Sequence, residues 1–117
     1  ETFGYAMQEL GKRQIAFFFT REYLADDSIR LEMKARAQGV PYIANMRLSR
    51  EDALDLLRSG QAEAVSFGKA YIANPDLYER LVQDEELNEL NLEHMIGTDV
   101  AAGYTDYPFL NKQLLES

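Results

Sequence analysis

The chain has 117 residues, of which 46% are hydrophobic and 27% are charged, and this balance is typical of a folded globular domain rather than of a disordered segment. Its formal net charge of −8 disfavours nucleic acid and anionic membrane as partners. The absence of cysteine excludes disulfides and cysteine metal sites, and the apolar runs are too short for a membrane span. We therefore expect one cytoplasmic domain over residues 1–117.

The first half of the chain alternates helical and strand-like patterns. Apolar residues at helical spacing predict a first helix that closes at residues 11–13. Residues 15–20 form an unbroken apolar run, which is typical of a strand buried on both faces of a parallel sheet. A helix over residues 28–38 that stops at Gly39 and a second buried strand over residues 40–45 follow.

The same alternation continues to residue 82. Ser49 and Asp52 have the spacing of a capping box, which predicts the start of a helix whose apolar side includes Leu57. Residues 64–67 read as a third short strand, and a helix is expected over residues 76–82. Helices and strands in this order, joined by short connections, predict βα units of one parallel sheet over residues 1–82.

The periodic pattern ends after residue 82. Residues 83–117 predict an irregular tail, within which residues 109–115 can form a short terminal helix. Tyr104 and Tyr107 are expected to pack and hydrogen-bond within this tail rather than touch a substrate. The single histidine, His94, is expected to be a surface or packing residue because no nucleophile pattern accompanies it.

The clearest functional signal lies in residues 64–76. An apolar strand pattern ends there at Gly68, which permits close approach of a ligand to the backbone. Lys69 follows and can place a positive charge on a phosphate, in the strand, turn and helix context that phosphate sites use. On the residues alone, a phosphate-binding role and a purely structural role for this turn are about equally supported.

Three segments carry a resemblance to a known family: Ser66–Lys69, Ile72–Leu77 and Gly103–Pro108. Together they resemble the last part of the Old Yellow Enzyme family of flavin-dependent alkene reductases. The resemblance implies a (β/α)8 barrel that holds FMN at the carboxyl ends of its strands and reduces alkenes with hydride from NAD(P)H. It implies for this chain an α/β fold made of three βα units of a TIM-barrel-type parallel sheet, with an irregular C-terminal tail.

The resemblance also implies where FMN would bind. The family places the FMN phosphate against the loops after the last two strands, which here offer Gly68 and Lys69 in one loop and Asn45 and Arg47 in the other. Lys69 stands where the family usually has arginine, and Met46 stands in a turn that commonly contains glycine. A Phe-Tyr pair near the flavin in relatives is replaced here by His94-Met-Ile.

No catalytic residue and no metal ligand is assigned, because the resemblance implies that the family's catalytic residues come from earlier strands. The leading hypothesis is a truncated C-terminal, FMN-phosphate-binding portion of a flavin oxidoreductase that is catalytically incomplete alone. A partial barrel leaves open sheet edges, so the expected partner is a missing N-terminal barrel portion or another copy of the chain. The alternative is a flavin-free half-barrel assembly module that has lost FMN binding.

Overall fold

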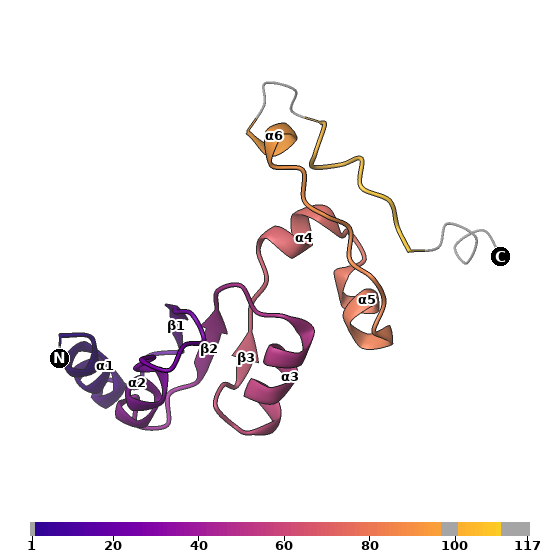
Figure 1. The fold of residues 1–117 in the computed structure, drawn as a ribbon. Helices are drawn as coiled ribbons and strands as arrows, with labels where there is room; N and C mark the ends of the chain where they lie inside the picture. The colour runs from indigo at the N-terminus through magenta and orange to yellow at the C-terminus, as the bar shows by residue number, and fades with distance from the viewer. Residues whose placement is uncertain (1, 97–100, 111–117) are drawn as a thin grey trace. The chain divides into compact units, whose positions relative to one another are not determined.

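The structure is a computed structural model that describes residues 2–96 and 101–110 (Figure 1). The chain divides into two compact units, which we call unit 1 (residues 1–67) and unit 2 (residues 68–117). Unit 1 contains the sheet, and unit 2 contains short helices joined by extended chain. Whether the two units form the one domain expected from composition stays a prediction.

Unit 1 is built from three helices and three strands that alternate along the chain. The strands are parallel and lie in the order β1-β2-β3, which confirms the α/β fold class with three strands of an open parallel sheet. The elements are α1 (Thr2–Lys12), β1 (Phe18–Arg21), α2 (Arg30–Arg36), β2 (Tyr42–Asn45), α3 (Arg50–Arg58) and β3 (Ala64–Val65).

Local signals in the sequence explain several of these boundaries. Ser49 caps α3, since its side chain accepts a hydrogen bond from the Asp52 N–H while the Asp52 side chain accepts one from the Ser49 N–H. The capping box predicted from the sequence is therefore confirmed. Gly39 has φ +82°, so it ends the second helical segment in the left-handed conformation expected there. That helix itself is shorter than predicted and spans only Arg30–Arg36.

One face of the sheet packs against the helices and forms the core. Phe18 pairs in register with Tyr42, and both side chains point to this buried face. The core cluster draws on α1, α2 and α3 as well as the sheet, and consists of Met7, Phe18, Met33, Ala37, Val40, Tyr42, Ala44, Leu56 and Ala62.

The opposite face of the sheet is not covered in unit 1. Phe17 and Phe19 are 52% and 53% exposed, so the prediction that residues 15–20 are buried on both faces is wrong. Side chains alternate between faces, and the helices of unit 1 pack only on the face that carries Phe18. Leu57 is also exposed, because α3 turns Ala53 and Leu56 toward the core instead.

Unit 2 has more helix than the sequence predicted. The expected helix is confirmed as α5 (Leu77–Gln83), but α4 (Lys69–Ala73) also forms, directly after Gly68. A further short helix, α6 (Leu92–Met95), lies inside the stretch predicted to be irregular, where the Asn91 side chain caps it. Phe109 and Leu110 are not helical, and the rest of the predicted terminal helix lies outside the described residues. Within residues 2–96 and 101–110, no helix is long and apolar enough to cross a membrane.

Candidate functional site

The carboxyl ends of the parallel strands in unit 1 gather polar side chains at one edge of the sheet. Asn45 is the last residue of β2, and its Nδ2 donates a hydrogen bond to Ser66 Oγ at 2.9 Å. Ser66 follows β3, and its N–H donates to the Ala44 carbonyl at 2.9 Å. These two bonds tie the loops after β2 and β3 together, as the parallel arrangement requires.

The turn after β2 has the positive φ angles that glycine favours, although it contains no glycine. Met46 has φ +114° and Arg47 has φ +50°, both in the region that residues with a side chain rarely adopt. Side chains from the end of β1 and the loop after it contact this turn. Arg21 Nε donates to Met46 Sδ at 3.2 Å, and the Arg47 guanidinium lies over the Tyr23 ring, 5.3 Å from its centroid.

The turn after β3 opens unit 2 with Gly68 and Lys69. The N–H groups of Tyr71 and Ile72 both donate to the Gly68 carbonyl, so α4 begins at Lys69. Lys69 is exposed, and it forms no ion pair with any residue in the described part of the chain. A Cβ built on Gly68 would meet no atom within 4 Å. Open space beside an unpaired cation fits a phosphate.

The four residues expected to bind the cofactor thus fall in two places. Asn45 and Arg47 lie at the sheet edge of unit 1, whereas Gly68 and Lys69 belong to unit 2. The sequence did not single out Tyr23, which lies under Arg47, and it did not single out Ser66 as the partner of Asn45. The usable signal for both was position, since each follows the carboxyl end of a parallel strand.

The motif around Asn74 and Asp76 holds the chain of unit 2 together. Asp76 and Arg80 are buried and paired, with Arg80 Nε 2.8 Å from Asp76 Oδ1. Arg80 Nη2 also donates to the Pro108 carbonyl at 3.0 Å, and Asp76 Oδ2 accepts from the Leu110 N–H at 2.6 Å. Burial alone would raise the pKa of Asp76, but the hydrogen bonds from Leu110 and Arg80 lower it.

Asn74 and Asn88 make a second set of bonds beside this pair. Asn74 is fully buried, and its Oδ1 accepts from the Asn88 N–H at 2.7 Å. Asn88 Nδ2 donates to the Ala73 and Pro108 carbonyls at 2.8 and 2.9 Å. The Ile72–Leu77 motif, which carries part of the resemblance, therefore acts in this chain as a structural clamp on the tail.

The aromatic turn of the tail is structural as well. Tyr107 Oη accepts from the Asn91 N–H at 2.8 Å, and Tyr104 Oη donates to the Met95 carbonyl at 3.1 Å. Gly103 has φ +78°, and a Cβ there would lie 2.6 Å from His94 Cβ. The expectations that these tyrosines bond within the tail, and that His94 is a surface or packing residue, are confirmed in the described residues.

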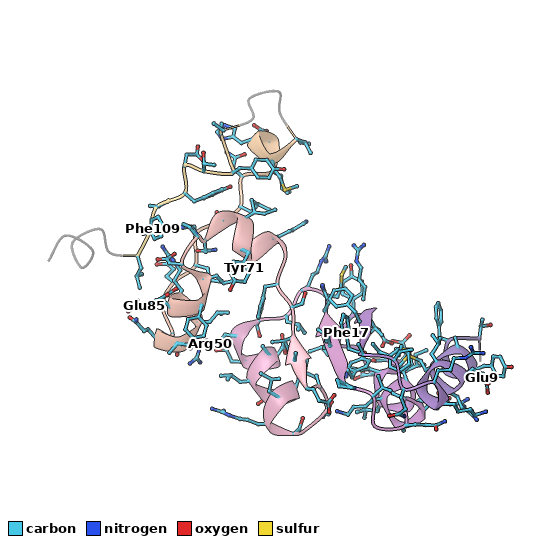
Figure 2. All side chains as sticks on the ribbon, turned by 180° about the vertical axis from the view of Figure 1, so that it is seen from behind. Glu9, Phe17, Arg50, Tyr71, Glu85 and Phe109 are labelled. Carbon is cyan, nitrogen blue, oxygen red and sulfur yellow. The ribbon has the colours of Figure 1, made fainter. Side chains whose placement is uncertain are left out.

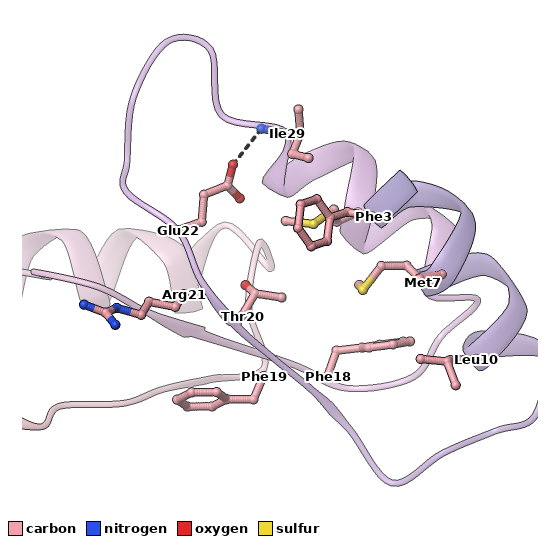
Figure 3. Close-up of a pocket in the computed structure, with 11 residues that line it drawn as sticks. Phe3, Met7, Leu10, Phe18, Phe19, Thr20, Arg21, Glu22 and Ile29 are labelled. Carbon is pink, nitrogen blue, oxygen red and sulfur yellow. Dashed lines mark hydrogen bonds between the residues drawn. The ribbon is translucent and has the colours of Figure 1, made fainter. Parts of the chain in front are cut away.

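A groove of about 410 Å³ lies between α1 and β1 in unit 1 (Figure 3). Its walls are mostly apolar and include Met7, Phe18 and Met33. Glu22 lies at its rim, with Oε1 accepting from the Ile29 N–H at 2.9 Å. Glu22 Oε2 is buried and has no hydrogen-bond partner among the described residues. Figure 2 shows the side chains of unit 1 with Phe17 labelled beside the sheet.

Comparisons with curated sequences and with solved structures both find similar proteins. No protein-family model matches the chain. The chain is 42% identical over 64 residues to 12-oxophytodienoate reductase 7 of Oryza sativa subsp. japonica, a match that covers 55% of this chain and 16% of that protein. It is 36% identical over 69 residues to 12-oxophytodienoate reductase 2 of Arabidopsis thaliana, covering 59% and 18%. The chain thus spans about a fifth of the length of the curated relatives it matches.

Solved structures match over more of the chain. The Old Yellow Enzyme homologue from Zymomonas mobilis superimposes with a TM-score of 0.82 at 33% identity, over 92% of this chain and 32% of that structure. Morphinone reductase in complex with tetrahydroNAD superimposes with a TM-score of 0.80 at 34% identity, over 94% and 30%. The chain is therefore similar, in sequence and in fold, to a portion of Old Yellow Enzyme family proteins.

Proposed function

We propose that this chain is the FMN-phosphate-binding portion of an Old Yellow Enzyme-type flavin oxidoreductase that reduces alkenes with NAD(P)H. The observation that carries the proposal is the turn after β3, where Gly68 faces open space and Lys69 holds an unpaired charge among the described residues. When bound, FMN supplies a carrier that takes hydride from the nicotinamide and passes it to the alkene. A cytoplasmic location stays a prediction from composition.

The residues of this chain would bind and orient the FMN phosphate and would take no part in the chemical step. Lys69 would place its ammonium on the phosphate as a point charge, since lysine lacks the bidentate fork of arginine. Gly68 would let the phosphate approach the N–H groups of Lys69 and Ala70, which have no partner within α4. Residues 68–117 carry 10 acidic and 3 basic side chains, so the Lys69 charge stands in an acidic surrounding. We therefore expect modest affinity for the phosphate.

Titration of the chain with FMN and with riboflavin, followed by flavin fluorescence, tests this proposal. Riboflavin lacks the phosphate, so we expect FMN to bind more tightly and Lys69→Ala to lower only the FMN affinity. Lys12→Ala is the matched control, because Lys12 lies on α1 in an ion pair with Glu9. Equal affinity for the two flavins, or no saturable binding, would refute phosphate recognition by this chain.

The free edge of β1 supports a proposal about the partner of the sheet. The N–H groups of Phe18 and Glu22 donate to β2-side carbonyls at 2.8 and 3.3 Å. Because hydrogen-bonding direction alternates along a strand, the backbone groups of Phe19 and Arg21 face the free edge. The free edge of β1 adjoins the apolar groove between α1 and β1. On the opposite face of the sheet, Phe19 exposes its ring. A strand apolar on both faces suits this position.

We propose that a further strand of the same barrel pairs with β1, rather than a second copy of the chain. Both neighbouring pairs in the sheet are parallel, and the solved relatives are about three times as long as the matched part. Co-expression with the unmatched part of the Zymomonas mobilis homologue tests this: we expect co-purification that Phe19→Lys abolishes and Tyr5→Lys, on the exposed side of α1, leaves intact. A discrete homo-oligomer of the chain alone, broken by Phe19→Lys, would favour self-association instead.

A further inference from the structure

Arg47 has a ring beneath it and no counter-charge beside it. Its guanidinium lies over the face of Tyr23, 5.3 Å from the ring centroid, and Tyr23 comes from the loop after β1. Within the described residues, Arg47 forms no ion pair with a carboxylate. The side chain is exposed, so its charge is accessible to an anion.

The contact with the ring leaves the N–H donors of Arg47 without a hydrogen-bond partner among the described residues. The guanidinium is planar and carries these donors in its plane. Those donors form a fork that matches the spacing of phosphate oxygens. Arg47 is therefore the residue of unit 1 that can hold a phosphate in a fixed orientation.

Hydrogen bonds from the end of β1 also fix the backbone of the turn that carries Arg47. Arg21 Nε donates to Met46 Sδ at 3.2 Å, and the Glu22 N–H donates to the Asn45 carbonyl at 3.3 Å. These contacts join the end of β1 to the turn after β2. Positive φ at both Met46 and Arg47 then sets the direction in which the Arg47 side chain leaves the backbone.

We propose that Tyr23 is a positioning residue that holds the Arg47 guanidinium ready for the phosphate of the flavin. The inference rests on the proposed function. It assigns to Tyr23 a role in distinguishing FMN from riboflavin through its contact with Arg47. The hydroxyl group plays no part, so the ring alone is required.

Flavin titration of four variants of the whole chain tests the proposal. Tyr23→Leu removes the ring, and we expect it to lower FMN affinity about two- to fivefold, the range of an exposed cation–π contact, with riboflavin affinity unchanged. Tyr23→Phe keeps the ring and should bind FMN like the parent chain. Arg47→Ala should lower FMN affinity by about tenfold or more, since it removes charge-assisted hydrogen bonds. Tyr5→Leu is the matched control, because Tyr5 is an exposed tyrosine on α1.

The effect of Tyr23→Leu in the Arg47→Ala background completes the design. If Tyr23 acts through Arg47, the second substitution should cause no further loss of FMN affinity. Thermal unfolding of each variant separates a binding effect from a loss of fold. If Tyr23→Leu and the parent bind FMN equally while FMN still exceeds riboflavin, the inference is overturned and the proposed function stands. If the parent shows no preference for FMN, the proposed function fails and this inference fails with it.

Discussion

Replacing Arg80 by methionine should destabilise unit 2 strongly. Arg80 is only 4% exposed and donates to the Asp76 carboxylate and to the Glu86 and Pro108 carbonyls. Methionine fills a similar volume but leaves the Asp76 charge buried without its cation. Removing one partner of a buried ion pair costs about 3–5 kcal/mol, a large fraction of the roughly 5–15 kcal/mol that holds a domain folded.

Urea denaturation followed by circular dichroism measures the loss, because the chain has no tryptophan to report by fluorescence. Hydrogen exchange locates it: amides of residues 86–96 and 101–110 should lose protection, whereas those of the sheet in unit 1 should not. Arg58→Met is the matched control, since Arg58 is exposed at the end of α3. A loss below about 1 kcal/mol with unchanged exchange in the tail would refute the assignment of Arg80 as the clamp.

Three further substitutions or conditions test the same contacts. The folded-state pKa of Asp76 lies below its ordinary value of 3.8, so the Asp76 carboxylate stabilises the fold fully above that pH. This stabilisation should be lost as pH falls through the folded-state pKa. A pH series of urea midpoints measures the loss, and midpoints that do not change in acid would contradict it. Met46→Gly should raise stability by about 1 kcal/mol by relieving the φ of +114°, and an unchanged midpoint would show that no strain is stored there. Gly103→Ala should lower stability by about 1–3 kcal/mol, since the φ is +78° and the new Cβ would lie 2.6 Å from His94 Cβ; wild-type thermal stability would contradict this.

Features that depend on neighbours in the chain were predictable from the sequence. The capping box of Ser49 and Asp52 lies within four residues, so its pattern alone identified the start of α3. The alternation of helix and strand gave the parallel sheet for the same reason, because short connections between βα units permit few arrangements. Long shared motifs then gave the resemblance to the Old Yellow Enzyme family, whose members are among the similar solved structures.

Features that depend on residues far apart in the chain were not predictable from the sequence. An apolar run such as residues 15–20 has the same composition whether one face or two are covered, so the exposure of Phe17 and Phe19 could not be read from it. The residues themselves do not predict the positive φ of Met46 and Arg47, because this chain has no glycine in the turn; only the resemblance, in which the turn commonly contains glycine, pointed to it. The contact between Arg47 and Tyr23 joins loops after different strands and required the register of the sheet.

Mapping amide chemical shifts during titration with FMN tests the central claim most directly. If the chain binds the flavin phosphate, the amides of Gly68 and Lys69 should shift saturably with FMN, and they should not shift with riboflavin. Binding that leaves these two amides unchanged, or that affects them equally with riboflavin, would contradict the assignment of this turn as the phosphate site.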